Sequence, residues 1–239
     1  MPAKYGTYHE VFLGGGALFF ALQPKNAILS DINTYLVNSF KAVRDDTAKL
    51  IQELGHHKRI HDKGHYNDAR KRLHLETDPS RSAALFIYLN RTCFNGLYRV
   101  NSGGRFNVPM GAYQNPRIVD EQTLYECARS LRGVTIRQGH FADCKIRKGD
   151  FYYLDPPYHN SYAGYDRSGF SDDDHCQLAE FCRRIDANLG YFMLSNSDTP
   201  MIRKLYAGFN IEVVSSRRTI SRDVSQRGKK QELIIRNYR

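Results

Sequence analysis

The stretch that decides the fold runs from Tyr8 to Asp31 and reads YHEVFLGGGALFFALQPKNAILSD. An apolar run over 8–13 predicts a first strand, and the glycine triplet at 14–16 predicts a tight turn after it. Residues 17–22 favour a helix that ends before a proline, and residues 26–32 predict a second buried strand. A strand, a glycine turn, a helix and a second strand form a βαβ unit, so we expect a parallel sheet.

The alternation of strands and helices stops after residue 54 and resumes at residue 134. The intervening segment is basic and polar at first, and its later part predicts a helix over 81–91 and a hairpin over 97–108. The rest of the chain predicts further elements: a long amphipathic helix over 34–54, strands over 134–138, 151–154 and 191–194, helices over 171–189 and 200–206, and an antiparallel pair over 209–214 and 232–236. We therefore predict an α/β fold, with a Rossmann-like domain over 1–54 and 134–239. A mostly helical subdomain that contains a β-hairpin is inserted over 55–133.

The composition favours a nucleic-acid partner. The 239 residues include 35 Lys and Arg against 25 Asp and Glu, a net charge of +10 at pH 7. Such an excess is typical of proteins that meet a polyanion. The sequence has no apolar run of ~18 residues for a membrane span, no secretory signal at its start and no CxxC among its five cysteines. We expect a cytoplasmic protein with free thiols and no membrane association.

Gly14, Gly15, Gly16 and Asp31 follow the first two predicted strands, where open α/β sheets bind their ligands. Glycines at such a turn let the backbone approach a cofactor, although an ordinary tight turn has the same pattern. A carboxylate at the end of the second strand can hydrogen-bond the two hydroxyls of a ribose, or it can cap the next helix. Because no GxGxxG spacing and no other pyrophosphate site is present, an adenosine cofactor without phosphates fits better than a dinucleotide.

The tetrapeptide Asp155-Pro156-Pro157-Tyr158, directly after the apolar strand FYYL, is the most specific signal in the chain. Two prolines fix φ and remove two N–H donors, so a carboxylate, bare carbonyls and an aromatic ring are held rigidly at a strand end. This arrangement suits an exocyclic amino group such as adenine N6. If the Asp155 carboxylate and the Pro156 carbonyl accept its two hydrogens, the nitrogen is oriented for attack while Tyr158 stacks on the base. Such catalysis works by positioning and electrostatics.

Seven motifs follow one another in a recognisable order across almost the whole chain. They are Phe12–Gly16, Leu29–Asn33, Asn90–Arg99, Phe106–Tyr113, Asp155–Tyr158, Leu194–Thr199 and Arg218–Ser221. In this order the chain resembles the Dam-type (D12 class) DNA adenine-N6 methyltransferases. The resemblance implies a sheet of the S-adenosylmethionine-dependent methyltransferase type, S-adenosylmethionine as methyl donor, double-stranded DNA as partner, and no metal. It also implies that the methyl group is transferred to a flipped adenine at GATC or a related site. The enzyme would be bacterial or phage-encoded, of the kind found in restriction-modification, and a monomer or weak dimer.

The resemblance also assigns roles to residues of this sequence. The cofactor site would comprise Glu10, Phe12, Gly14, Gly16, Asp31, Phe141, Asp143 and Asp155. Catalysis would lie with Asp155, Pro156, Pro157 and Tyr158. Residues 55–133 would recognise the target, with Phe94 as a wedge in the duplex, Asn95 beside it, and Leu97, Arg99, Pro109 and Tyr113 on the site. An arginine such as Arg99 can donate two hydrogen bonds to guanine.

The chain departs from the family at its start. Family members begin with a segment of the type Lys-Trp-x-Gly-Gly-Lys, whereas this sequence has no Trp and begins seven residues before Tyr8. A catalytically impaired DNA-binding module is therefore an alternative function. A protein-glutamine N-methyltransferase is a second alternative, but those enzymes resemble this site with Asn in place of Asp155.

Two further segments of the sequence are basic and polar. His57, His61 and His65 are spaced so that one helix face could present them to a metal, but the neighbouring Lys and Arg favour a solvated basic face. Near the end of the chain Arg217 and Arg218 belong to a cluster of positive charges. We expect this cluster to contact DNA phosphates rather than to be only a solvated hairpin.

Overall fold

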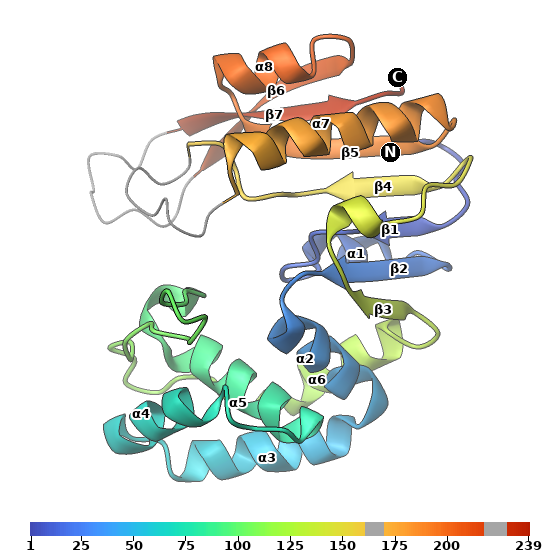
Figure 1. Cartoon of the computed structure of the whole chain (residues 1–239). Helices are drawn as coiled ribbons and strands as arrows, with labels where there is room; N and C mark the ends of the chain where they lie inside the picture. The colour runs from blue at the N-terminus through green and yellow to red at the C-terminus, as the bar shows by residue number, and fades with distance from the viewer. Residues whose placement is uncertain (161–169, 218–228) are drawn as a thin grey trace. The chain divides into compact units, whose positions relative to one another are not determined.

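The seven strands form a single sheet in the order β3-β2-β1-β4-β5-β7-β6 (Figure 1). Their bounds are β1 Tyr8–Glu10, β2 Ala27–Asp31, β3 Thr135–Gln138, β4 Phe151–Leu154, β5 Tyr191–Ser197, β6 Asn210–Arg217 and β7 Lys229–Arg236. This computed structural model describes residues 1–160, 170–217 and 229–239, with the backbone alone at 216, 217, 229 and 230. The predicted α/β class is confirmed, including the closing antiparallel pair, in which Ile211 lies opposite Ile235.

The strand order reverses between β1 and β4. β1 pairs in parallel with β2 on one side, where Tyr8 lies opposite Ala27, and with β4 on the other, where Tyr8 lies opposite Phe151. β5 continues in parallel beside β4, and β7 then runs antiparallel to β5. In open α/β sheets the crevice outside the carboxyl ends of two such strands is the usual ligand site. The glycine turn after β1 and the Asp155 corner after β4 lie at this point of the sheet.

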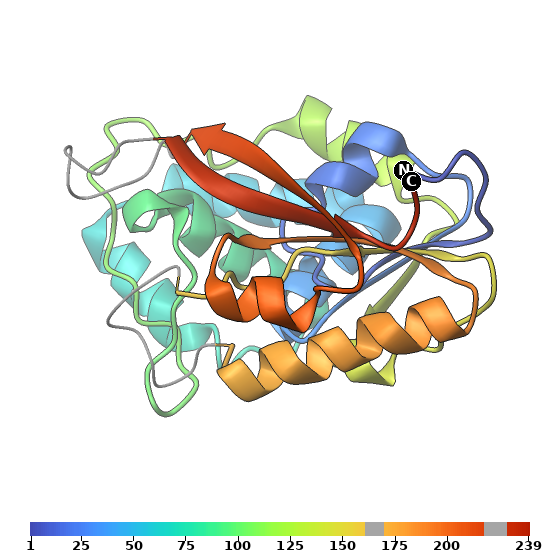
Figure 2. The same cartoon turned by 90° about the horizontal axis from the view of Figure 1, so that it is seen from above.

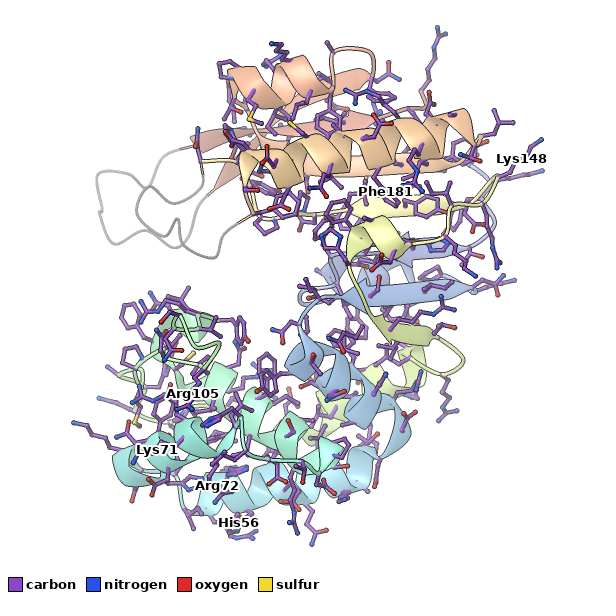
Figure 3. All side chains as sticks on the ribbon, viewed as in Figure 1. His56, Lys71, Arg72, Arg105, Lys148 and Phe181 are labelled. Carbon is purple, nitrogen blue, oxygen red and sulfur yellow. The ribbon has the colours of Figure 1, made fainter. Side chains whose placement is uncertain are left out.

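The chain divides into two compact units, one of residues 1–19, 24–32 and 139–239 and the other of 20–23 and 33–138. The second unit thus begins before residue 55, where the sequence predicts the start of the inserted subdomain. In the first unit α7 (Asp172–Ala187) lies along one face of the sheet, next to the short α8 (Pro200–Leu205) (Figure 2). Phe181 points from α7 toward the sheet (Figure 3), where its ring meets Tyr152 edge-on at 6.2 Å.

The second unit is helical and is organised around α5 (Pro79–Thr92). Helices α2 (Thr34–Asp45), α3 (Thr47–Arg59) and α4 (Lys63–Arg72) pack against α5, and α6 (Glu121–Ser130) packs against α2 and α3. Small side chains at Ser82, Ala83 and Ala84 let the neighbouring helices approach α5 closely, and Leu85 and Tyr88 fill the core beside them. A helix buried around most of its circumference is typical of the centre of a helical layer.

The prediction of one helix over 34–54 is wrong. The chain forms two helices, α2 and α3, which meet at Asp46. Asp46 leaves helical geometry, with φ −149° and ψ 63°, and its side chain accepts a hydrogen bond from the Lys49 N–H as the cap of α3. The apolar periodicity continues across the break, so it concealed a cap that satisfies the open N–H groups of a new helix.

The expectation that the histidines form a solvated basic face is also wrong. His57 is only 3% exposed, and its Nδ1 lies 2.9 Å from Nε2 of His65. The His57 ring stacks on Tyr88 at 4.9 Å, and Nδ1 of His61 lies 2.8 Å from the Tyr88 hydroxyl. Burial lowers the pKa of His57 to about 4, so this histidine is neutral at pH 7. His57 and Tyr88 thus lie in the core of the helical unit, and His61 and His65 are half-buried beside them.

Among the described residues, no helix is both long and apolar enough to cross a bilayer. No three His, Cys, Asp or Glu side chains of the described residues gather in a way that would hold a metal ion. All five cysteines, at positions 93, 127, 144, 176 and 182, are free thiols, as the sequence predicts.

Candidate functional site

A cavity of about 700 Å³ opens at the carboxyl ends of β1, β2 and β4, within the first unit. This volume lies in the range of about 300–1,000 Å³ that is usual for small-molecule sites. Its lining includes eight residues that the sequence singled out: Phe12, Gly14, Asp31, Phe141, Asp155, Pro156, Pro157 and Tyr158. It also includes seven that sequence reasoning missed: Val11, Ile32, Gly139, His140, Phe170, Asp174 and Glu232. The motifs after three separate strands therefore meet in one cavity.

Gly14 and Asp31 are joined by a hydrogen bond at the mouth of this cavity. Gly14 has φ +47°, and its N–H donates to Asp31 Oδ2 at 3.2 Å. Asp31 does not cap the next helix, because the Asn33 side chain accepts the hydrogen bonds from the first turn of α2. This result removes the capping alternative for Asp31 and places its carboxylate among the cavity residues.

The Asp155-Pro156-Pro157-Tyr158 corner follows β4 directly. Pro156 is buried and Pro157 is exposed, so the first ring anchors the corner while Asp155 stays at the surface of the cavity. The Asp155 Oδ1 atom accepts a hydrogen bond of 2.5 Å from the Ser195 hydroxyl on β5. Burial raises the pKa of Tyr158 well above its usual value, so its phenol stays protonated.

Three aromatic rings gather at one side of the cavity. Phe12 and Phe141 lie 5.4 Å apart between ring centres, and Phe170 lies 5.8 Å from Phe12 and 5.9 Å from Phe141. Aromatic rings at such separations attract one another and offer flat faces to a planar ligand. This side of the cavity is therefore aromatic.

The lining is acidic although the chain is basic overall. Asp31, Asp155, Asp174 and Glu232 all contribute carboxylates to it. The pKa of Asp174 is lowered by the hydrogen bond from the Ser171 hydroxyl, so this side chain is ionised at neutral pH. A cavity with this charge attracts a cationic ligand and repels phosphate groups, in agreement with the absence of a pyrophosphate motif from the sequence.

Three of the residues assigned to the cofactor site are not part of the cavity lining. Glu10 is buried, and its Oε2 accepts a hydrogen bond of 2.6 Å from the Tyr8 hydroxyl. Gly16 has φ +65° and closes the turn through its N–H, which donates to the Leu13 carbonyl at 2.7 Å. Asp143 is exposed at the end of the short helix η2 (Phe141–Asp143). Gly16 and Asp143 thus lie in the segments that follow β1 and β3, and Glu10 lies at the buried end of β1.

An irregular hairpin in the helical unit carries the assigned DNA residues of its segment. Bridges join Cys93 to Met110 and Val100 to Phe106, and the Phe94 N–H donates to the Pro109 carbonyl at 2.9 Å. The predicted hairpin therefore exists as isolated bridges rather than as two regular strands. The apolar side chains on it are exposed, with Phe94 39%, Leu97 41% and Tyr113 44% accessible to solvent.

Two further features of the assigned DNA residues concern their geometry. Asn95 lies in η1 (Phe94–Gly96) with φ +53°, which an Asn tolerates better than most residues. The Arg99 Nε atom donates to Asn107 Oδ1 at 2.7 Å, and this contact fixes the plane of the guanidinium. The Arg217 side chain and Arg218 lie outside the described residues, so the expected phosphate contacts there stay a prediction.

The fold and the cavity together define a class of protein. An open sheet that reverses between β1 and β4, with an acidic cavity and an Asp-Pro-Pro-Tyr corner at the reversal, is that of an S-adenosylmethionine-dependent methyltransferase. Residues 1–220 match the D12 class N6 adenine-specific DNA methyltransferases, and the chain belongs to this family.

Curated methyltransferases match the chain along most of their own length. The type II methyltransferase M1.LlaDCHI of Lactococcus lactis subsp. cremoris is 38% identical, over 100% of this chain and 88% of the relative. The type II methyltransferase M.MjaIII of Methanocaldococcus jannaschii is 39% identical, over 97% and 88%. A DNA adenine methylase of Serratia marcescens is 34% identical, over 94% and 87%. The protein is a DNA adenine methyltransferase, and its family implies S-adenosylmethionine as the methyl donor.

Proposed function

We propose that the chain methylates N6 of an adenine that has been flipped out of duplex DNA, at GATC or a related site. The observation that carries this proposal is the meeting of Gly14 and Asp31 with Asp155 and Pro156 in one cavity. A nucleoside cofactor and an extruded base need such neighbouring places, because the methyl carbon and the accepting nitrogen must come into contact. A base inside a duplex cannot reach Asp155, and its extrusion costs a few kcal/mol.

The corner after β4 orients the adenine amino group for the reaction. The N6 lone pair of adenine is delocalised into the ring, which makes the amino group a poor nucleophile. The Asp155 carboxylate and the Pro156 carbonyl accept its two hydrogens, so the nitrogen can become tetrahedral as it attacks. Tyr158 stacks on the base. S-adenosylmethionine, when bound, supplies a methyl group activated by its sulfonium, so no covalent enzyme intermediate is needed.

The cavity residues fit this cofactor. We assign the ribose hydroxyls to Asp31 and the adenine to the rings of Phe12 and Phe141. The acidic lining favours the sulfonium and ammonium charges of the cofactor. Glu10 acts from the end of β1, and Gly16 and Asp143 act from the segments that follow β1 and β3, rather than from the cavity surface.

The helical unit is proposed to recognise the DNA sequence, through residues 55–133. The exposed Phe94 offsets the unstacking that base extrusion requires, with Asn95 beside it. Arg99, whose plane Asn107 holds, donates to O6 and N7 of a guanine. The other proposed contacts to the target site come from Leu97, Pro109 and Tyr113. Arg217 and Arg218 are proposed to contact phosphates, and the enzyme to act as a monomer or weak dimer.

Replacement of the catalytic carboxylate tests the proposal. Asp155→Ala should abolish methylation of duplex DNA and leave DNA affinity within about threefold of the parent, because Asp155 acts on the extruded base and not on the duplex. Asp173→Ala is the matched control, since it removes an exposed carboxylate of α7 that is not part of the cavity lining. Methyl transfer is followed with labelled S-adenosylmethionine, and DNA affinity by fluorescence anisotropy. Equal loss of both properties would make Asp155 structural.

Two arginines of the hairpin over 97–108, Arg99 and Arg105, allow base recognition to be tested separately from phosphate contact. Arg99→Ala should relax base preference at one position of the site, where a bidentate pair contributes about 1–3 kcal/mol of discrimination. Arg105→Ala removes an exposed arginine of the same hairpin (Figure 3) and should weaken DNA binding equally for all DNA sequences. The measurement is methylation of DNA pools randomised within the mapped site. Identical sequence profiles for the two variants would remove the proposed role of Arg99.

A further inference from the structure

We propose that Ser195 is a positioning residue of the methyl-transfer site, where its hydroxyl sets the orientation of the Asp155 carboxylate. The inference rests on the proposed role of Asp155 in holding the amino group. Ser195 lies on β5, next to the strand that carries the Asp155 corner. Its action is through Asp155, not through contact with the substrate.

The pairing of β4 and β5 brings the two side chains together. Leu154 lies opposite Leu194, so the following residues, Asp155 and Ser195, are also neighbours. The Ser195 Oγ atom is 2.5 Å from Asp155 Oδ1 and 3.5 Å from the Leu154 carbonyl, so the carboxylate is its close partner. Ser195 is only 4% exposed, and water competes little for its hydroxyl.

Asp155 needs such a partner because it is exposed and lies at a cavity surface. The terminal torsion of an aspartate is broad, so its carboxylate plane is not fixed by its own rotamer preference. An ionised carboxylate only accepts hydrogen bonds, and a serine hydroxyl has one hydrogen to donate. Donation to Oδ1 therefore fixes the plane and leaves Oδ2 for the amino group.

The same hydroxyl also reaches the other end of the corner. Hydrogen bonding with Ser195 opposes the effect of burial, which raises the pKa of Tyr158 well above its usual value and that of Tyr153 to about 12. Ser195 therefore lies within reach of both Asp155 and Tyr158, the first and last residues of the tetrapeptide.

The next residue of β5 holds the backbone that follows the corner. The Asn196 side chain is fully buried, and its Oδ1 accepts a hydrogen bond of 3.0 Å from the His159 N–H. Because this separate contact anchors the loop itself, loss of the Ser195 hydroxyl should free the Asp155 carboxylate without displacing the whole corner. A defect in orientation is therefore expected to appear in kcat rather than in binding.

The test compares Ser195→Ala with Ser195→Thr, which keeps a hydroxyl at the same atom. Ser195→Ala should lower kcat by about 10- to 100-fold, the scale expected for a misplaced catalytic group, with KM for S-adenosylmethionine and DNA affinity within about twofold. Ser195→Thr should restore kcat to within about threefold of the parent, since the donor is retained. Ser215→Ala, an exposed serine on β6, is the matched control and should change nothing.

Several results would overturn the inference. These are an unchanged kcat in Ser195→Ala, a threonine variant as slow as the alanine variant, or a rise in KM that accounts for the whole defect. If Ser195→Ala does not fold by circular dichroism, the comparison passes to Ser195→Cys, whose thiol is a weak donor and should be slow where threonine is fast. Asp155→Ala in the same assay distinguishes failure of the proposed function from failure of the inference about Ser195. An active Asp155→Ala enzyme ends the proposed function, whereas an inactive one with a fully active Ser195→Ala ends only this inference.

Discussion

Glu10 shows how a single buried carboxyl affects the site and the stability of the chain. It ends β1, is 2% exposed, and lies close enough to Asp155 for the charge of that carboxylate to act on it. Burial raises its pKa to about 7, and hydrogen bonds from Tyr8 and from the Phe19 N–H oppose this rise. Glu10 is therefore partly protonated near neutral pH, which limits the negative charge beside Asp155.

Glu10→Gln should make the protein more stable at alkaline pH relative to acidic pH. In the parent the folded pKa of about 7 lies above the unfolded value of 4.5, so ionisation favours the unfolded chain as pH rises between them. Stability from this group is complete below pH 4.5 and is lost by pH 8, a loss of roughly 3 kcal/mol that glutamine avoids. Urea unfolding of both proteins at several pH values from 4.5 to 8 measures the difference.

The exposed Glu121 provides the control for this prediction. Glu121→Gln makes the same chemical change at an exposed position and gives the reference against which the effect of Glu10→Gln is read. A pH-independent effect of Glu10→Gln would mean that the Glu10 carboxyl ionises equally easily in the folded and unfolded chain.

At the scale of elements, the bounds of a helix or strand can be predicted where glycine, proline or a capping residue marks its ends. α1 (Ala17–Leu22) and β4 (Phe151–Leu154) have the predicted bounds, because a glycine stands within two residues before each of them and a proline within two residues after. The break between α2 and α3 was missed because the apolar stripe runs through it, although Asp46 before Thr47 is a usable start signal. The role of the histidines depends on Tyr88, which a different helix supplies, and no local pattern contains that information.

The residues of the cavity likewise divide into those that the sequence predicts and those that it does not. Gly14, Asp31 and Asp155 were found because strand ends are visible in the sequence and the sheet brings them to one crevice. Glu232 was missed because only the antiparallel pairing of β7 with β5 brings it to the cavity, where it lies opposite Ser197. Ser195 was missed as a site residue because its role depends on the register of two strands.

The capping box of α7 makes a prediction at this scale. The Ser171 hydroxyl accepts a hydrogen bond from the Asp174 N–H at 3.2 Å, and Asp174 Oδ2 accepts from the Ser171 N–H at 2.8 Å. Ser171→Ala should lower the free energy of unfolding by about 1 kcal/mol, the usual cost of a lost N-cap. Thermal or urea unfolding at pH 7 measures it, with the exposed turn residue Ser102→Ala as control. A loss no larger than that of the control would show that the cap adds nothing to stability.

At the scale of the whole molecule, two opposite charge patterns serve two ligands. The chain carries a net charge of +10, whereas the cavity presents Asp31, Asp155, Asp174 and Glu232. Positive charge on the exterior attracts a DNA duplex, and an acidic cavity keeps phosphates out while it admits a cationic cofactor. The proposed extrusion would bring an uncharged base, rather than a phosphate, to this cavity.

This separation predicts different salt dependence for the two ligands of one protein. Duplex binding that neutralises 6–10 phosphates should weaken by about 10³- to 10⁵-fold between 50 and 200 mM salt, because condensed counterions are released on binding. S-adenosylmethionine has a single excess charge and meets its partners within a cavity, so its affinity should change by no more than about threefold over the same range. Titration calorimetry for the cofactor and fluorescence anisotropy for DNA give both values. Arg105→Ala should flatten the DNA slope by about one and leave the cofactor titration unchanged. A cofactor affinity as salt-sensitive as that of DNA would mean that surface charge, and not the carboxylates of the cavity, controls cofactor binding.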